Sequence, residues 1–375
     1  MHIADATMFF APHSGGVKRF LLTKRAWFRR HTPFRHTLVV PGPHADHPEE
    51  GIVTVPAPLL PGGAGYRMPL RRAPWIRCLS DLAPDLIEAG DPYLVPWAVL
   101  AAGQRLGVPV TAFYHSDLER LLVDRLGTAV GPLVRSYQRS LYRRFDVVFA
   151  PSRVMQAKLQ ALGVKRALLQ PLGVDVDLFH PRQRDPGLRR ELGLAADTRL
   201  LVFAGRLSPE KHVDQLEAAF ARLGPRYHLL LIGGEGAARR GRNVTVYPYQ
   251  DDNGRLSRLI ASCDALVHAG DQETFGLVVL EAMACGLPVI GVDAAAVPEL
   301  VDETVGLLVP RPEAAALAEG IVALYQRDLG ALGAAARQRA VGGYGWDAVM
   351  RSLVGHYARL GGVPVPVEEP RHVVA

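Results

Sequence analysis

The stretch His268-Ala-Gly-Asp-Gln-Glu273-Thr-Phe-Gly276-Leu-Val-Val-Leu-Glu281-Ala-Met-Ala-Cys-Gly-Leu-Pro-Val-Ile-Gly291 decides the fold of this chain. The apolar run 265–267 precedes it and predicts a buried strand. A turn with a glycine follows, and the run 274–284 has the length of a helix. A second strand is predicted over 288–292. Strand, turn, helix and strand in this order indicate a β-α-β unit with parallel strands.

The same alternation covers most of the chain and occurs twice. Short apolar runs predict buried strands at Leu38–Val40, Val108–Thr111, Val147–Ala150, Leu200–Ala204, Leu229–Ile232, Ala265–Val267 and Pro288–Val292. Helical stretches such as Val213–Leu223 separate them, and a polar segment with several prolines and glycines at 172–198 predicts a linker. The fold class is therefore α/β, with two Rossmann-like doubly wound domains facing a central cleft, where ligands are expected at the carboxyl edges of the strands.

Composition supports two soluble domains. The 375 residues, 49% of them hydrophobic and 21% charged, are enough for two buried cores. The three cysteines lack CxxC spacing, which argues against disulfides and zinc and favours a reducing cytoplasm. The N-terminus has no signal-peptide pattern, and no apolar run approaches the roughly 18–20 residues that span a bilayer. We expect a cytoplasmic protein, soluble or peripheral on the inner face of the membrane.

Positive charge is concentrated in the first half of the chain. Residues 1–180 carry a net charge of +8, whereas the remainder carries −2. The first half is thus a candidate for contact with an anionic membrane, although an arginine-rich genome explains the same excess. Within it, Leu121–Arg144 mixes five arginines with Leu, Val and Tyr, so it is either an amphipathic membrane-docking helix or an ordinary surface helix.

Two spaced glutamates are the first candidates for a binding site. Glu273 lies in the turn before the predicted helix, for which Thr274 is the expected N-cap, and Glu281 lies one to two turns inside it. The helix N-terminus offers backbone N–H groups to a phosphate, and each carboxylate can accept hydrogen bonds from sugar or ribose hydroxyls. A lone Glu281 would be a solvated helix residue, but its neighbours are apolar.

Cations and glycines follow the other strands. Arg206 and Lys211 leave the strand 200–204 five residues apart, which suits a diphosphate, although each could form a structural salt bridge instead. The segment 231–236 contains Gly233 and Gly234 but lacks a complete dinucleotide fingerprint. In the first half, the segment Pro12–Gly16 either cradles a phosphate from the opposite domain or is only a turn. His115, after the strand near Val110, either binds a sugar hydroxyl or is structural.

Taken together, these residues resemble the retaining glycosyltransferase family 4, with the GT-B architecture. Gly205-Arg206-Leu207…Glu210-Lys211 resembles the donor-diphosphate element of that family, and the segment from Glu273 through Glu281 to Ile290 resembles its E-x7-E signature. Gly15-Gly16 matches the N-terminal glycine turn, Gly173-Val-Asp175 the turn before the linker, and Tyr344-Gly-Trp346 the start of the C-terminal helix.

The resemblance implies roles for single residues. Arg206 and Lys211 would neutralise the donor diphosphate, Glu281 would bind the ribose, and Glu273 would face the donor sugar. The expected catalytic residues are His115, Arg206, Lys211 and Glu273, and the expected donor-binding residues are Gly15, Gly16, Gly205, Gly234, Thr274, Phe275, Gly276, Leu277 and Glu281. His115 would bind the sugar near the reacting carbon.

The resemblance also implies a domain plan. Residues 1–178 would bind the acceptor, 179–345 would bind the nucleotide-sugar donor, and 346–375 would form a helix packing back on the first domain, followed by a tail. No cofactor or metal is expected, because Asp175-Val-Asp177 and Asp251-Asp252 are read as structural, and no nucleic acid is expected as a partner.

The implied reaction is retaining transfer of a hexosyl group, mannose or glucose-like, to a glycan or lipid-linked acceptor. The donor is GDP- or UDP-linked, with GDP-mannose preferred by analogy to similar enzymes of envelope-glycan synthesis. The alternatives are a GT-B epimerase or hydrolase and a non-catalytic nucleotide-sugar-binding protein. A Rossmann dehydrogenase is disfavoured by the incomplete glycine fingerprint.

Overall fold

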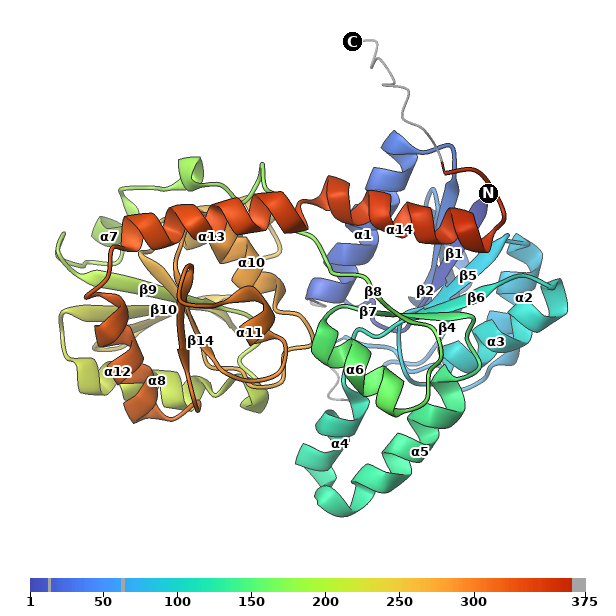
Figure 1. Cartoon of the computed structure of the whole chain (residues 1–375), viewed down its shortest axis with the longest axis horizontal. Helices are drawn as coiled ribbons and strands as arrows, with labels where there is room; N and C mark the ends of the chain where they lie inside the picture. Colours follow the sequence, from blue (N-terminus) through green and yellow to red (C-terminus); the bar gives the residue numbers. More distant parts are fainter. Residues whose placement is uncertain (13–14, 62–64, 366–375) are drawn as a thin grey trace, which may run out of the picture. The chain divides into compact units, whose positions relative to one another are not determined.

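The chain divides into two compact units. The structure is a computed structural model that describes residues 1–12, 15–61 and 65–365 (Figure 1). Unit 1 comprises Met1–Pro171 and the segment from Val349 onward, and unit 2 comprises Leu172–Ala348. The chain passes from one unit to the other after Pro171 and again after Ala348. Near these two positions, Val174 pairs with Gly345 in an isolated parallel bridge. The sequence had placed these domain edges at 178 and 345.

Unit 1 contains a single eight-stranded sheet in the order β3-β4-β2-β1-β5-β6-β7-β8. Its strands are β1 (His2–Ala6), β2 (Arg35–Gly42), β3 (Asp46–Glu49), β4 (Ile52–Pro56), β5 (Leu86–Ala89), β6 (Val110–Phe113), β7 (Val147–Ala150) and β8 (Ala167–Leu169). All neighbours are parallel except β3 and β4. The chain winds outward from β1 in both directions, so the winding reverses between β1 and β5.

The helices of unit 1 are α1 (Gly16–His31), α2 (Ala73–Leu82), α3 (Val95–Leu106), α4 (Leu118–Leu126), η1 (Thr128–Val130), α5 (Gly131–Tyr142), α6 (Arg153–Ala161) and most of α14 (Trp346–Leu360). The single helix that the sequence suggested over 121–144 is wrong. Gly127, with φ of 88°, ends α4, and α5 begins four residues later with a proline in its first turn. A left-handed glycine and a proline start a new helix rather than continue one.

Unit 2 contains a seven-stranded sheet in the order β11-β12-β10-β9-β13-β14-β15. Its strands are β9 (Arg199–Ala204), β10 (Tyr227–Gly234), β11 (Arg239–Arg240), β12 (Val244–Pro248), β13 (Ala265–His268), β14 (Val289–Val292) and β15 (Gly306–Val309). Only β11 pairs in the antiparallel sense. The winding reverses between β9 and β13, as it does between β1 and β5 in unit 1.

The helices of unit 2 are η2 (Pro181–Gln183), α7 (Leu188–Glu191), η3 (Pro209–Lys211), α8 (Val213–Leu223), α9 (Asn253–Ala261), α10 (Leu277–Ala284), α11 (Val297–Leu300), α12 (Ala314–Leu324) and α13 (Leu329–Tyr344). The predicted α/β class is confirmed, and all seven predicted strands exist. Helix α8 has the predicted bounds. The expected linker 172–198 instead contains η2 and α7, and it belongs to unit 2.

A buried charge cluster joins the central strands of unit 1 to α14. The Lys24 side chain from α1 is fully buried, and its ammonium lies 2.7 Å from Asp5 Oδ2 on β1 and 2.9 Å from Glu88 Oε1 on β5. The Tyr357 hydroxyl, from α14, donates to Glu88 at 2.7 Å. Burial raises the pKa of Asp5, but the Lys24 charge outweighs this and lowers it to about 2. Burial raises the pKa of Glu88, so the Lys24 charge mainly offsets that of Asp5, and the cluster ties α14 to the sheet of unit 1.

We predict that Lys24→Met destabilises unit 1 by about 3–5 kcal/mol, because it leaves two buried carboxylates without their cation. Urea unfolding at pH 7 measures the loss. Lys165→Met, at an exposed lysine, is the matched control and should change little. Equal stability of the two variants would show that the cluster does not hold unit 1 together.

Candidate active site

Two loops leave the sheet of unit 2 where its winding reverses. One follows β9 and runs from Gly205 to Lys211, and the other follows β13 and runs from Ala269 to Gly276. In a doubly wound sheet, ligands bind at this position, beside the carboxyl ends of the strands. The fold therefore brings the sequence-predicted Arg206 and Glu273 onto neighbouring loops.

The two loops are joined by an ion pair between Lys211 and Glu273. The Lys211 ammonium contacts Glu273 Oε1, and His268 Nε2 lies 3.0 Å from the same oxygen. The side chains of Lys211 and Glu273 are only 17% and 16% exposed. A second link connects the same loops, since His212 Nε2 lies 3.1 Å from Asp271 Oδ1. The structure thus assembles a compact polar group from residues about 60 positions apart in sequence.

This environment keeps Glu273 ionised. Burial raises the pKa of the Glu273 carboxyl, but the Lys211 charge and the His268 hydrogen bond outweigh burial and hold that pKa well below its usual range. An ionised carboxylate accepts hydrogen bonds and does not donate them. Glu273 is therefore suited to bind hydroxyl groups and is not suited to act as a general acid.

Helix α10 begins shortly after Glu273 in the sequence, and its N-terminus lies at the same edge of the sheet. Thr274 is not its N-cap, which corrects the sequence prediction. The cap position belongs to Gly276, whose φ of 96° only glycine adopts readily. Phe275 is buried against the ring of Tyr344 at 6.0 Å, so the turn continues two residues further before α10 starts at Leu277. The N–H groups of Val279 and Leu280 donate to the Gly276 carbonyl, whereas those of Leu277 and Val278 precede the first intrahelical bond and suit an anion.

Arg206 and Glu281 differ sharply in exposure. The Arg206 side chain is 64% exposed, and its ion pair with Glu210 is long, at 3.8 Å. It can therefore bind an anion with little desolvation cost. Glu281 is 4% exposed and lies in α10 between apolar neighbours. Its burial differs from the solvated position expected of a lone helix glutamate, and its role in a binding site stays a prediction.

Glycines bring the ends of β9 and β10 close together. Gly205 directly follows β9, and Gly233 and Gly234 end β10. A Cβ atom on Gly233 would lie 1.9 Å from the Gly205 carbonyl oxygen, and the φ of Gly233 is 134°. Gly234 is also confined, because its Cβ would lie 2.7 Å from Val246 Cγ1. The backbone at this edge therefore has room only for glycine.

The remaining candidates belong to unit 1. His115 follows β6, and its ring stacks on Phe113 at 4.3 Å and meets Phe20 edge-on. Burial is the main cause that lowers the pKa of His115, to about 3, so the imidazole is neutral. Gly15 precedes α1 and Gly16 is its first residue. His13 and Ser14, from the same predicted turn, lie outside the described residues.

Sequence reasoning missed Asp91, which lies where the winding of unit 1 reverses. The carboxylate follows β5 and accepts hydrogen bonds from the N–H groups of Met8, at 2.8 Å, and Tyr93, at 2.9 Å. Burial raises its pKa to about 6. His268 was missed as well, although it ends β13 directly before the quoted turn. In both cases the available signal was a titratable residue at the end of an apolar strand.

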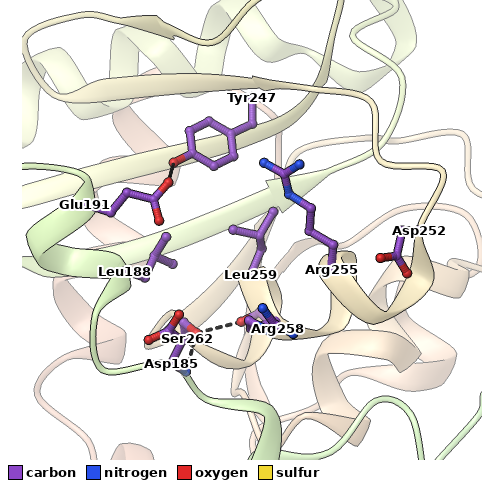
Figure 2. Close-up of a pocket in the computed structure, with 9 residues that line it drawn as sticks. All are labelled: Asp185, Leu188, Glu191, Tyr247, Asp252, Arg255, Arg258, Leu259 and Ser262. Atoms are coloured by element: carbon purple, nitrogen blue, oxygen red, sulfur yellow. Dashed lines mark hydrogen bonds between the residues drawn. The ribbon is translucent and has the colours of Figure 1, made fainter.

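A polar pocket of about 210 Å³ lies elsewhere in unit 2, among α7, β12 and α9 (Figure 2). Arg255 and Arg258 line it, and Tyr247 donates to Glu191 at 2.8 Å on its other side. None of the sequence-predicted site residues lines this pocket. In the described part of the chain, no group of three or more His, Cys, Asp or Glu side chains is placed to hold a metal. No helix of that part is both long and apolar enough to cross a bilayer.

We predict that Gly233→Ala destabilises unit 2 by at least about 2 kcal/mol more than Gly236→Ala, because the added methyl group meets backbone atoms. Gly236 is the matched control, since its φ of 70° is also left-handed but open space surrounds its Cβ position. Thermal unfolding of both variants measures the difference. Similar losses would mean that the close approach of β9 and β10 is unimportant.

We predict that Glu273→Gln lowers the free energy of unfolding by about 1–3 kcal/mol at pH 7, where the native ion pair is intact. A carboxyl whose folded pKa is depressed contributes stability above its unfolded pKa and loses it as the pH falls through the folded value. The difference from the unmodified protein should therefore shrink below about pH 4.5, the ordinary value for glutamate.

The matched control for this experiment is Glu319→Gln, at an exposed glutamate of α12. Denaturant unfolding across pH 3–8 in about one-unit steps provides the measurement. A pH-independent difference for Glu273→Gln would contradict the depressed pKa.

Comparison with known proteins supplies the family. Residues 14–193 match Glycosyltransferase Family 4, and residues 185–339 match Glycosyl transferases group 1. A GDP-mannose-dependent alpha-mannosyltransferase of Mycobacterium tuberculosis is 35% identical over 76% of this chain and 76% of its own length. A protein of the same description from Mycolicibacterium smegmatis is 32% identical over 95% of this chain and 97% of its own length.

The solved structures confirm the predicted GT-B fold. Sucrose-phosphate synthase from Thermosynechococcus elongatus matches with a TM-score of 0.81 over 96% of this chain and 99% of its own, at 22% sequence identity. That identity supports a shared fold and no more, whereas the sequence relatives also share the chemistry of glycosyl transfer. The chain therefore belongs to the group 1 glycosyltransferases, enzymes that transfer a hexosyl group from a nucleotide sugar.

Proposed function

We propose that this enzyme transfers a mannosyl group from GDP-mannose to a glycan or lipid-linked acceptor, with retention of the anomeric configuration. The donor is inferred from the two mycobacterial relatives, which are described as GDP-mannose-dependent. The observation that carries the site assignment is the Lys211–Glu273–His268 group at the winding reversal of unit 2. Unit 2 is thus the donor unit, and unit 1 is proposed to bind the acceptor.

Glu273 is proposed to hold the donor sugar. Its ionised carboxylate has one oxygen engaged by Lys211 and His268, and the second oxygen can accept hydrogen bonds from sugar hydroxyls. The amide groups of Thr274, Phe275, Gly276 and Leu277 lie on the same turn and at the start of α10, and they are proposed to contact the sugar or its phosphates.

Positive charge for the diphosphate is proposed to come from Arg206, Lys211 and the N-terminus of α10. The Lys211 ammonium has three N–H donors, so it can contact a phosphate oxygen while it keeps its pair with Glu273. Arg206 is exposed and can bind two phosphate oxygens at once. Together these groups stabilise the GDP leaving group as its charge develops, and we propose that no metal ion is needed.

The other predicted residues complete the proposal. Glu281, buried in α10, is proposed to bind the ribose, and the backbone at Gly205 and Gly234 is proposed to approach the nucleotide closely. In unit 1, the neutral His115 is proposed to bind the donor sugar near its reacting carbon, and Gly15 and Gly16 are proposed to approach the diphosphate.

Retention is proposed to occur by attack on the face from which GDP departs. The oxygen of the acceptor hydroxyl bonds to the anomeric carbon, the bond to the diphosphate oxygen breaks, and the acceptor proton passes to that oxygen. Glu273, which is ionised at neutral pH, does not supply the acidic carboxyl that a glycosidase-like pair of carboxylates requires. We also propose that the reaction takes place in the cytoplasm, with the basic unit 1 near an anionic membrane when the acceptor is a lipid.

We predict that GDP-mannose and GDP raise the melting temperature of the enzyme, whereas UDP-glucose and UDP do not, because a ligand stabilises the folded state that binds it. Arg206→Ala and Lys211→Ala should each weaken GDP-mannose binding by at least about tenfold, since each loses a charge-assisted contact to phosphate. Calorimetric titration provides the dissociation constants.

Arg222→Ala, at an exposed arginine of α8, is the matched control and should bind GDP-mannose normally. The donor site is wrong if Arg206→Ala and Lys211→Ala bind as tightly as this control. The choice of donor is wrong if UDP-glucose binds in place of GDP-mannose. Release of GDP that increases when a membrane extract is added supports the transferase over a hydrolase.

A further inference from the structure

His268, the last residue of β13, contacts the carboxylate that is proposed to hold the donor sugar. Its side chain is 1% exposed, and its Nε2 atom lies 3.0 Å from Glu273 Oε1. An ionised carboxylate only accepts hydrogen bonds, so Nε2 carries a hydrogen and donates it. Nδ1 is buried and forms no hydrogen bond within the part of the chain that the structure describes. A second hydrogen on Nδ1 would be an unsatisfied buried donor, so the ring donates to Glu273 through Nε2 alone.

The imidazole ring of His268 has little freedom to turn. Its centroid lies 6.1 Å from that of Phe203, which is buried on β9. The backbone of Gly270 is also close, because an added Cβ there would lie 2.8 Å from His268 Cε1 and 3.3 Å from Lys211 Cδ. A glycine at position 270 thus leaves room for the imidazole and for the Lys211 side chain to reach the same carboxylate.

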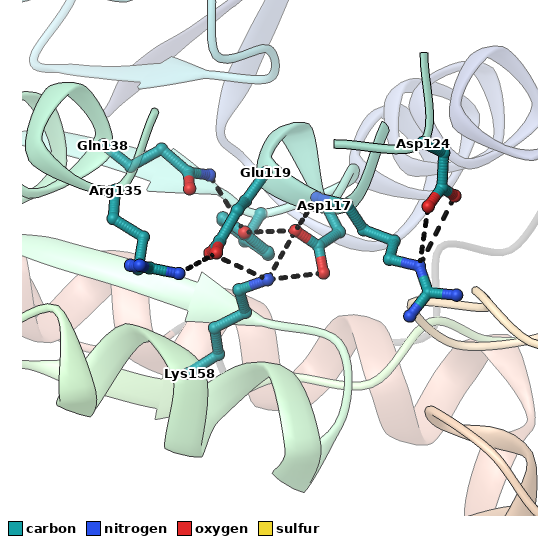
Figure 3. Close-up of polar contacts among 8 residues, drawn as sticks. Asp117, Glu119, Asp124, Arg135, Gln138 and Lys158 are labelled. Carbon is teal, nitrogen blue, oxygen red and sulfur yellow. Dashed lines mark hydrogen bonds and ion pairs between the residues drawn. The ribbon is translucent and has the colours of Figure 1, made fainter. Parts of the chain in front are cut away.

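The ion pair of Lys158 with Asp117 in unit 1 shows how a carboxylate of similar exposure is used inside the protein (Figure 3). The Lys158 ammonium lies 2.7 Å from both oxygens of Asp117, and the backbone N–H of Arg120 donates to Oδ1. Asp117 is also the N-cap of α4. Both oxygens of this carboxylate therefore have partners within unit 1 and stabilise its fold.

Glu273 has a different arrangement of partners, because Lys211 and His268 both contact Oε1. Two donors from two different elements hold this oxygen in place, so the carboxylate presents Oε2 at a defined position. A fixed acceptor loses less conformational freedom when a sugar hydroxyl binds to it. Without His268, the carboxylate would be held by Lys211 alone, through a flexible four-carbon side chain.

We propose that His268 is a positioning residue for sugar recognition, which fixes Glu273 through its Nε2–H so that the donor sugar binds to the other carboxylate oxygen. Gly270 contributes by leaving room for the imidazole. This proposal deepens the proposed function and rests on the assignment of Glu273 to the donor sugar. His268 should therefore affect the binding of the sugar part of GDP-mannose and not the binding of GDP, whose diphosphate is assigned to Arg206 and Lys211.

Calorimetric titration of the full chain with GDP-mannose and with GDP tests this role. His268→Leu, which removes the N–H and nearly keeps the volume, should raise the dissociation constant of GDP-mannose by about tenfold and that of GDP by less than about twofold. His268→Gln should restore most of the affinity for GDP-mannose, since the glutamine amide can donate from a position similar to that of Nε2. Gly270→Ala, which displaces the ring and removes no polar group, should resemble His268→Leu.

The matched control is His228→Leu. His228 is another buried histidine of unit 2, and its Nε2 lies 2.9 Å from Thr245 Oγ1 near the start of β10. Its replacement should lower the melting temperature, while the ratio of the two dissociation constants stays unchanged. A general loss of stability therefore does not imitate the result expected for His268.

Glu273→Ala separates this role of His268 from the proposed function. If Glu273→Ala weakens GDP-mannose binding selectively and the His268 and Gly270 variants do not, the positioning role is wrong and the donor-sugar assignment stands. If Glu273→Ala leaves both dissociation constants unchanged, the assignment of Glu273 is wrong and the positioning role fails with it. An equal loss of GDP and GDP-mannose binding in His268→Leu, with an unchanged control, would also overturn the proposal.

Discussion

The pairing of Lys211 with Glu273 links the two loops that define the candidate active site. A buried carboxylate without a partner is expensive in free energy, and the uncompensated group would take up a proton instead. Lys211 from the β9 loop and His268 from the end of β13 both contact Glu273, so the charge remains and the loops stay together. The start of α10, the exposed Arg206 and the tight glycine backbone are arranged around this fixed carboxylate. Its ionised state suits it to accepting hydrogen bonds and not to donating a proton.

Unit 1 has a buried charge cluster on β1 and β5, the strands equivalent to β9 and β13, and α14 shields this cluster from solvent. Lys24 bridges Asp5 on β1 and Glu88 on β5, and Tyr357 covers the pair from α14. This cluster is completely buried, whereas Lys211 and Glu273 retain some contact with solvent. The same physical device therefore serves two purposes. In unit 1 it holds the C-terminal helix against the sheet, and in unit 2 it leaves the pair partly accessible to solvent, where we propose that it contacts the donor.

The sequence predicted seven of the fifteen strands that the structure describes, because parallel strands covered on both faces become continuous apolar runs, and it did not predict the other eight. It predicted Glu273, Glu281, Arg206 and Lys211 because they follow such runs or interrupt apolar ones. The prediction failed where contacts between residues far apart in the sequence determine the local structure. Thr274 was expected to cap α10, but the burial of Phe275 extends the turn to Gly276. The contacts of Lys211 with Glu273 and of Asp91 with Met8 join residues 62 and 83 positions apart, and no local pattern encodes them.

Hydrogen–deuterium exchange of the full chain with and without GDP-mannose tests the central claim most directly. The account predicts slower amide exchange in peptides that cover Gly205–Lys211 and Ala269–Glu281, because the donor would contact the loops after β9 and β13 and the start of α10. Peptides that cover α7 and α9, which line the separate polar pocket, should be unchanged. Protection confined to α7 and α9, with none around Glu273, would contradict the assignment of the donor site.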